Sequence, residues 1–126
     1  MKHDMLQRAR DAAGLAYSPY SNFRVGAAVA AGGEVYTGCN VENASYGLAL
    51  CAERNAIFTA IAVGHRKITC VAVACIDGGA ASALMPCGAC LQVIAEFAEP
   101  ETSILVDRAG EFTLAQLLPL GFRLPK

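Results

Sequence analysis

A chain of 126 residues with no low-complexity run or Pro/Gly/Ser-rich linker predicts a single domain over residues 1–126. The net charge of −1 and the scattered basic residues argue against a nucleic-acid partner and favour a small substrate. No apolar stretch approaches the roughly 20 residues that cross a bilayer, and the N-terminus lacks the apolar centre of a secretory signal. We therefore expect no membrane partner and a cytoplasmic location.

Periodicity and turn residues divide the chain into alternating helices and strands. In chain order, the expected elements are a helix over Met5–Tyr17, strands over Arg24–Ala31 and Glu34–Cys39, a helix over Cys51–Val63, a strand over Ile68–Ile76, a helix over Cys87–Phe97, a strand over Thr102–Asp107 and a short helix over Thr113–Leu118. The intervening polar or glycine-rich segments, expected as loops, include Ser18–Asn22, Asn40–Gly47 and Asp77–Pro86. This order predicts a mixed sheet with helices packed on its faces.

The apolar content is high for so short a chain. Hydrophobic residues make up 55% of the sequence, more than a single small core buries easily. Some of these side chains are expected in subunit interfaces. A core rich in alanine is the alternative explanation, and composition alone leaves both open.

Cysteine spacing predicts a metal site. In a reducing compartment, six cysteines are more readily thiolate ligands or buried apolar residues than disulfides. Cys87 and Cys90 follow a proline at the expected start of a helix, where free backbone N–H groups and the helix dipole stabilise thiolates. Cys51, at the expected start of another helix, could add a third thiolate, and Glu53 follows two residues later. Three ligands on zinc leave the open coordination position that a catalytic site needs.

The same cysteines leave other readings open. A Cys-x-x-Cys pair alone also fits a thioredoxin-like redox site or half of a structural zinc knuckle. A structural zinc site would need a fourth ligand, and the candidates are Cys39, Cys70, Cys75 and His65. Two of these, Cys70 and Cys75, lie inside an apolar strand pattern that core packing explains better. A Cys-x-Glu element followed by Pro-Cys-x-x-Cys is, in contrast, the signature of zinc-dependent nucleobase deaminases.

Arg54 is a candidate for compensating charge at the metal. Three thiolates around zinc give a formal net charge of −1, which weakens the pull of the metal on the proton of a water molecule. Arg54 could donate hydrogen bonds to one or two of the sulfurs and withdraw charge from them. It could equally be a solvated arginine on the helix surface, and spacing does not decide between the two.

Five segments between about Tyr17 and Phe122 resemble the small homotetrameric class of cytidine deaminases. They are residues 18–28 (SPYSNFRVGAA), 38–47 (GCNVENASYG), 51–54 (CAER), 86–90 (PCGAC) and 117–122 (LLPLGF). The resemblance implies a three-layer α/β/α fold with a mixed, mostly five-stranded sheet, one zinc ion per subunit and a homotetramer with shared active sites. The implied reaction is hydrolytic deamination of cytidine and deoxycytidine to uridine and deoxyuridine, with release of ammonia, in pyrimidine salvage.

The resemblance also implies residue roles. The zinc ligands would be Cys51, Cys87 and Cys90, and Glu53 would carry a proton from the attacking water to the ring N3 and then to the leaving amine. The residues implied to bind substrate are Phe23 against the pyrimidine, Asn40 and Glu42 at the ribose 3′-hydroxyl, Ala52, and Tyr46 and Phe122, which would reach a neighbouring subunit's site. From the residues alone, Asn40 and Glu42 also fit turn chemistry, and Phe23 and Phe122 also fit core aromatics.

Two features depart from the family pattern. Leu91 stands where an arginine usually follows the second cysteine of the Cys-x-x-Cys pair, which leaves charge compensation more dependent on Arg54. The sequence also ends at Lys126, soon after Phe122, so tail contacts that would support a tetramer are expected to be fewer. The level of activity and the strength of the oligomer are the properties that these departures affect.

Two rival functions remain at this stage. The first is a deaminase of the same fold that acts on a modified nucleoside, an aminonucleoside antibiotic or a base within RNA. The run Asn40–Asn43 favours a free nucleoside, and the near-neutral charge argues against RNA. The second is a zinc-stabilised binding module without catalysis, which would need a fourth protein ligand and no Glu53.

Overall fold

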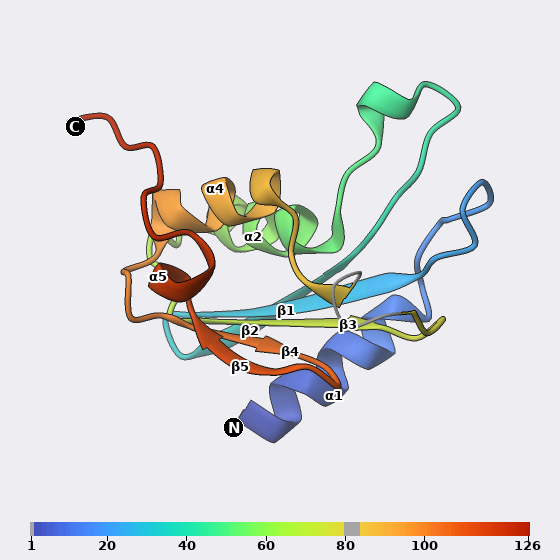
Figure 1. The fold of residues 1–126 in the computed structure, drawn as a ribbon, viewed down its shortest axis with the longest axis horizontal. Coiled ribbons are helices and arrows are strands. Elements are labelled where there is room, and N and C mark those ends of the chain that lie inside the picture. The colour runs from blue at the N-terminus through green and yellow to red at the C-terminus, as the bar shows by residue number, and fades with distance from the viewer. Residues whose placement is uncertain (1, 80–83) are drawn as a thin grey trace.

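The computed structural model describes residues 2–79 and 84–126 of the chain. Its strands, in chain order, are β1 (Val25–Ala31), β2 (Glu34–Cys39), β3 (Cys70–Cys75), β4 (Ser103–Val106) and β5 (Gly110–Thr113). They form one sheet in the order β2-β1-β3-β4-β5, in which β3 and β4 are parallel and the other neighbours antiparallel. Helix α1 (Lys2–Ala13) covers one face, and α2 (Ala52–Ala62) and α4 (Gly88–Phe97) cover the other (Figure 1). The expected three-layer α/β/α fold is confirmed.

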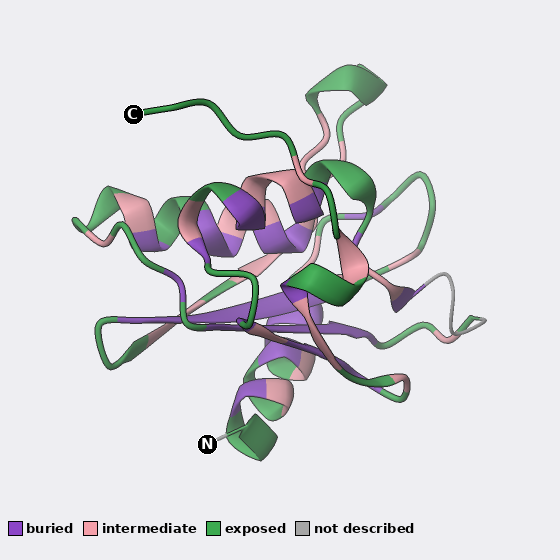
Figure 2. Cartoon of the chain, turned by 60° about the vertical axis from the view of Figure 1, so that its left-hand side comes forward, coloured by how far each residue is buried: buried purple, intermediate pink, exposed green. Residues whose placement is uncertain are grey.

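The two central strands are buried on both faces, which explains their unbroken apolar sequence. Successive side chains of β1 and β3 point to opposite faces of the sheet. One set packs in a core cluster with α2 and α4, and the other set packs in a second cluster with α1. Figure 2 shows the buried segments of the sheet between the helix faces that turn toward it. The cluster under α1 is built largely from alanine, so part of the high apolar content is a small-residue core.

Small residues let α1 lie close to the sheet. A Cβ atom added at Gly26 would lie 1.9 Å from the carbonyl oxygen of Ala9 and 2.4 Å from the backbone nitrogen of Ala13. No side chain larger than hydrogen fits there without moving the helix. Glycine at this position therefore sets the distance between the helix and β1.

The observed elements differ from the expected ones mainly at their ends. The first helix was expected over Met5–Tyr17, but α1 ends at Ala13, and Gly14 begins a turn that leaves Leu15 82% exposed. The pattern did not predict β5 or the short 3₁₀ helix η1 (Tyr46–Leu48), because each is too short to show a period. The last helix, α5 (Leu114–Leu117), begins at Thr113 with a capping box.

The expected loop Asp77–Pro86 lies partly outside the described residues. Within residues 2–79 and 84–126, no helix has the length and apolar content needed to cross a bilayer.

An arginine–aspartate pair ties α1 to the residue after β4. Arg10 Nη2 lies 2.7 Å from Asp107 Oδ1, Arg10 Nε lies 2.9 Å from Asp107 Oδ2, and Asp107 is buried. The Arg10 hydrogen bond holds the pKa of the Asp107 carboxyl below its usual value. We expect Asp107→Ala to lower the free energy of unfolding at neutral pH by about 1–3 kcal/mol, since the change leaves a partly buried guanidinium unpaired.

This contribution should depend on pH. Because the folded pKa of Asp107 is depressed, the pair stabilises fully above the usual value of 3.8 and loses its effect as the pH falls through the lower folded value. Urea unfolding of the wild type and of Asp107→Ala, at neutral pH and in acid, measures the difference. The difference should shrink on acidification, and a constant difference would assign the effect to packing instead of charge.

Candidate active site

Three thiols meet where two helices begin. Cys51 and Cys87 are the N-cap residues of α2 and α4, and Cys90 lies in the first turn of α4. The Sγ atoms of these three residues all lie within 4.8 Å of one another. Both helices therefore direct the positive ends of their dipoles at the cluster, which favours thiolates.

The cluster fits zinc. Zinc takes thiolate ligands at about 2.3 Å in a tetrahedral arrangement, and three sulfurs on two helix N-termini provide three corners of such a site. In the part of the chain that the structure describes, no fourth metal-binding side chain joins the group. Among the earlier candidates, Cys70 and Cys75 are buried in β3, and His65 Nε2 lies 2.9 Å from the hydroxyl of Tyr36. The donor set thus leaves one position for water or substrate.

Arg54 contacts the sulfur cluster, as one of the two readings of the sequence predicted. Its Nη2 donates a hydrogen bond to Cys51 Sγ across 3.3 Å. Hydrogen bonds from the Cys90 thiol and from Arg54 lower the pKa of Cys51 below its usual value, against the opposing effect of burial. Leu91 is packed into the core on the inner side of α4 and takes no part in this charge balance.

Glu53 is a buried carboxyl group beside the thiols. It is only 4% exposed, and burial raises its pKa to about 7. Removal from water disfavours the charged form of a carboxyl group, so this side chain can hold or release a proton near neutral pH. A group with that property next to a metal site is suited to general acid and base catalysis.

A cavity of about 390 Å³ connects these groups to a polar wall. The predicted site residues that line it are Phe23, Asn40, Glu42, Cys51, Ala52, Glu53 and Cys87. The buried Cys90 lies in the same thiol cluster without lining the cavity. Segments far apart in the sequence therefore come together in one pocket large enough for a small ligand.

Asn40 and Glu42 hold the loop before β1 in place. The amide of Asn40 accepts a hydrogen bond from the Val25 backbone N–H and donates one to the Phe23 carbonyl oxygen, each at 2.8 Å. The carboxylate of Glu42 accepts from the backbone N–H of Tyr20 at 2.9 Å and from both the N–H and the hydroxyl of Ser21. The hydrogen bond from the Ser21 hydroxyl lowers the pKa of Glu42 below its usual value. Asn40 and Glu42 therefore do both things that the sequence left open: they form hydrogen bonds that stabilise the loop, and they line the cavity.

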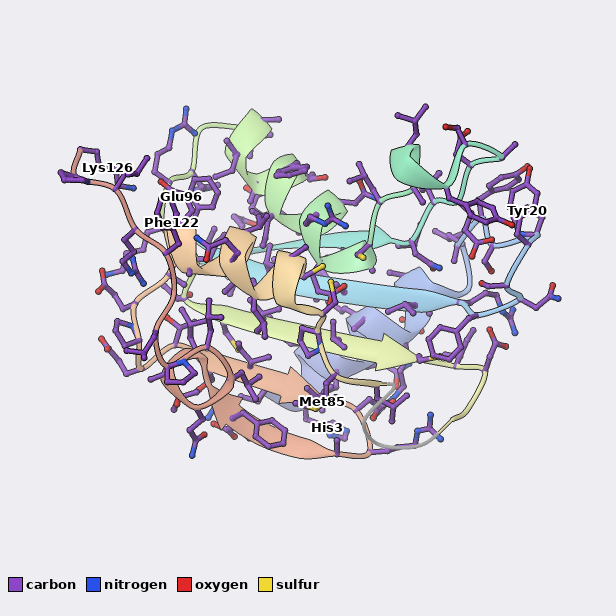
Figure 3. The ribbon with its side chains drawn as sticks, turned by 45° about the horizontal axis from the view of Figure 1, so that its top comes forward. His3, Tyr20, Met85, Glu96, Phe122 and Lys126 are labelled. Carbon is purple, nitrogen blue, oxygen red and sulfur yellow. The ribbon has the colours of Figure 1, made fainter. Side chains whose placement is uncertain are left out.

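The structure does not bring Tyr46 or Phe122 into this cavity. Tyr46 is 79% exposed on η1 and lies edge-on to Tyr20, with ring centroids 6.3 Å apart. It lines a second, adjoining hollow that shares Ser21 and Glu42 with the first. Phe122 is 68% exposed and lies beside Glu96 and Lys126, at the end of the molecule opposite to Tyr20 (Figure 3).

Several lining residues were not predicted from the sequence to line the site. They are Ser21, Val25, Val73, Cys75, Leu84 and Met85. The apolar ones come from β1, from β3 and from the segment before α4, where nothing local distinguishes a cavity wall from core. Ser21 had a signal, because it stands in the polar loop segment Ser18–Asn22, two residues before Phe23.

Comparisons with known proteins agree with this geometry. Residues 1–106 match the zinc-binding region of cytidine and deoxycytidylate deaminases. The chain is 43% identical over 123 residues to a cytidine deaminase of Sporosarcina psychrophila, covering 94% of this chain and 88% of that protein. It is 47% identical over 118 residues to a cytidine deaminase of Mycobacterium tuberculosis, covering 92% and 85%.

A solved structure extends the comparison to the fold. The crystal structure of cytidine deaminase from Burkholderia pseudomallei superposes with a TM-score of 0.86 at 41% identity, over 97% of this chain and 99% of that one. The three-thiol cluster, the sheet order and the sequence identity all lead to one assignment. The chain belongs to the cytidine and deoxycytidylate deaminase family.

Proposed function

We propose that this chain is a cytidine deaminase that hydrolyses cytidine and deoxycytidine to uridine and deoxyuridine with release of ammonia, a reaction of pyrimidine salvage. The observation that carries the proposal is the buried carboxyl group of Glu53 in one cavity with the three-thiol zinc site. Relatives named as cytidine deaminases support the choice of substrate.

Cys51, Cys87 and Cys90 would hold a zinc ion, which would supply the Lewis acidity that makes a water molecule nucleophilic near neutral pH. Glu53 takes a proton from that water and delivers it to the ring N3 as the oxygen attacks C4. The Glu53 carboxylate then takes the proton of the hydroxyl group now on C4 and passes it to the amine. The C4–N bond breaks and the C4 carbonyl forms, so that one water is consumed and one ammonia is released. A pKa of about 7 allows Glu53 to act as base and acid in turn.

The cavity wall gives each part of the nucleoside a partner. Phe23 offers an apolar surface for the pyrimidine, and Ala52, fully buried at the start of α2, leaves room next to Glu53. Asn40 and Glu42 hold the ribose 3′-hydroxyl, since both line the same cavity and their positions are fixed by hydrogen bonds to the backbone. The depressed pKa of Glu42 keeps its carboxylate ionised as an acceptor.

The direct test is to incubate the purified, zinc-loaded protein with cytidine and to measure uridine and ammonia in equal amounts. Deoxycytidine, cytosine and CMP serve as comparison substrates. Turnover of the nucleosides and not of cytosine supports recognition of the ribose. An inactive but zinc-loaded protein would contradict the proposal; assays with modified nucleosides would then test the rival deaminase, and a lack of any turnover would favour the binding module.

We further infer a homotetramer with shared active sites. Several large apolar side chains are exposed to solvent in the single chain. They include Leu48, Leu120 and Leu124 besides Tyr46 and Phe122. The backbone of Phe122 is held to α4, because the Gln92 amide donates to its carbonyl oxygen at 2.6 Å and accepts from its N–H at 3.2 Å. These two hydrogen bonds hold the backbone so that the Phe122 ring is exposed and lies away from the cavity of its own subunit. In the tetramer the ring would cover the base bound in a neighbouring subunit.

We expect Phe122→Ala to raise KM by roughly 10-fold, because the ring would be buried against the base in the oligomer, an aromatic contact contributes about 0.5–1.5 kcal/mol beyond its area burial, and about 1.4 kcal/mol corresponds to a factor of ten. Sedimentation establishes the oligomeric state of the variant. Co-refolding Phe122→Ala with Glu53→Gln then tests sharing: mixed oligomers contain sites with Glu53 from one chain and Phe122 from another, and they should regain the wild-type KM. A fully active wild-type monomer, or no recovery in demonstrably mixed oligomers, would contradict a shared site.

The single-domain organisation over residues 1–126 and the cytoplasmic location remain proposals from the sequence.

A further inference from the structure

An arginine–aspartate pair lies beside the substrate cavity. Arg24 Nη2 lies 2.8 Å from Asp77 Oδ1, and Arg24 Nε lies 3.1 Å from Asp77 Oδ2. The same carboxylate oxygen, Oδ2, also accepts a hydrogen bond from the backbone N–H of Arg24 at 2.6 Å. One aspartate therefore binds both the side chain and the main chain of the residue that follows Phe23.

The carboxylate of Asp77 takes the place of a backbone acceptor at the end of the sheet. β1 and β3 pair antiparallel from Ala30↔Cys70 to Val25↔Cys75, and the backbone N–H of Ile76 still donates to the Arg24 carbonyl oxygen at 3.2 Å. A regular antiparallel pair would exchange a second bond in return. Here the Arg24 N–H donates to the Asp77 side chain instead, so the side chain extends the strand pairing up to the cavity wall.

The backbone of Phe23 is thereby fixed from three directions. Its N–H donates to the Ser21 hydroxyl at 3.0 Å, its carbonyl oxygen accepts from Asn40, and the next N–H is held by Asp77. Of these partners, Ser21 and Asn40 line the cavity, whereas Asp77 and Arg24 do not. Asp77 is thus a support behind the wall, reaching Phe23 through the peptide that joins it to Arg24.

We propose that Asp77 is a positioning residue for the pyrimidine: it fixes the Phe23–Arg24 peptide so that the Phe23 ring forms the cavity wall, and Arg24 orients its carboxylate. The proposal rests on the proposed contact of Phe23 with the base. Arg24 is 45% exposed at its side chain and Asp77 22%, so surface pairing alone would contribute little to stability. The function of the Arg24–Asp77 pair is therefore to hold the Phe23 ring in place at the cavity wall.

The chain contains a matched control. Arg10 and Asp107 form a pair of the same geometry, with Nη2–Oδ1 at 2.7 Å and Nε–Oδ2 at 2.9 Å. Asp107 follows β4 much as Asp77 follows β3, and β3 and β4 are parallel neighbours. Neither Arg10 nor Asp107 lines the cavity. A substitution at Asp107 therefore changes the same chemistry without reaching the pyrimidine wall.

The test compares steady-state kinetics with cytidine for Asp77→Ala, Asp77→Asn, Arg24→Ala and Asp107→Ala, with zinc content and Tm measured for each. We expect Asp77→Ala to raise KM roughly three- to tenfold, the range that follows from losing one or two hydrogen bonds, with kcat nearly unchanged. Arg24→Ala should raise KM less, because Asp77 can still accept from the backbone. Asp107→Ala should lower Tm and leave KM unchanged.

Phe23→Ala separates failure of this inference from failure of the proposed function. If Phe23→Ala raises KM and Asp77→Ala does not, the positioning role is overturned and the base contact stands. If Phe23→Ala leaves KM unchanged, the base contact is overturned and the positioning role with it. In the double variant, Asp77→Ala should add nothing to the effect of Phe23→Ala. Should Asp77→Ala fail to fold, Asp77→Asn and Arg24→Ala carry the same comparison, and KM unchanged in both would overturn the inference.

Discussion

Glu53→Gln is expected to lower kcat with cytidine by roughly 10²- to 10⁴-fold, the usual contribution of a general acid and base. Glutamine keeps the size and the hydrogen-bonding shape of the side chain but cannot take up or release a proton. KM should change much less, because Phe23, Asn40 and Glu42 still line the cavity. Stopped or discontinuous assays of uridine formation give both constants.

Two controls make this result specific to proton transfer. Zinc content should stay at the wild-type level, since the metal is held by thiols and not by Glu53. Thermal stability should also stay the same or rise, because burial already disfavours the ionised form and glutamine removes that cost. Glu99→Gln, at an exposed position, is the control for replacing a glutamate by glutamine anywhere in the chain, and it should leave kcat unchanged. A Glu53→Gln variant that keeps zinc and full activity would refute the proposed mechanism.

Cys87→Ala is expected to lower zinc affinity by more than about 100-fold, since loss of a direct ligand should exceed the 10- to 100-fold effect of second-shell changes. Activity should fall with zinc occupancy. Dialysis of the wild-type protein against a chelator should abolish turnover and lower Tm, because a metal that binds only the folded chain stabilises it. Adding zinc back should restore both properties in the wild type and neither in Cys87→Ala.

Cys75→Ala is the matched control for the zinc experiment. Cys75 is a free thiol that lines the same cavity, but it lies in β3 and outside the three-thiol cluster. We expect the Cys75→Ala variant to bind zinc and to turn over cytidine as the wild type does, with only a small loss of stability from the smaller side chain. Loss of zinc in Cys75→Ala equal to that in Cys87→Ala would mean that the assigned ligand set is wrong.

The ligand pattern was predictable because its signals are local. A cysteine at a helix N-cap can be recognised from the proline before it and the helical pattern after it, and the Cys-x-x-Cys spacing places two sulfurs on one turn. The helices and long strands were likewise predictable from period and composition. Their ends were less so: the first helix stops at Ala13 because Gly14 turns the chain, although apolar residues continue as far as Tyr17.

The short elements were not predicted from the sequence, for a different reason. β5 has four residues, two of them exposed, so neither period nor composition distinguishes it from a loop. It forms because β4 offers an unpaired edge on which Gly110–Thr113 can fold back. That edge exists only in the assembled sheet, which is why the resemblance to a family implied five strands whereas the residues alone predicted four.

The sequence by itself determined the family, the zinc-binding thiols, the order of the main elements and the acid–base candidate, because each of these depends on residue types at short, fixed spacings. The tertiary structure decided which residues share a cavity. Packing of α2 and α4 side by side on one face of the sheet brings Cys51 to Cys87 and turns Arg54 toward the sulfur. It also places Phe122 at the end of the molecule away from Tyr20 (Figure 3), and it joins Asp77, which follows β3, to Arg24, which precedes the neighbouring strand β1. Such relations depend on distances between segments remote in sequence, which only the packed sheet and helices fix.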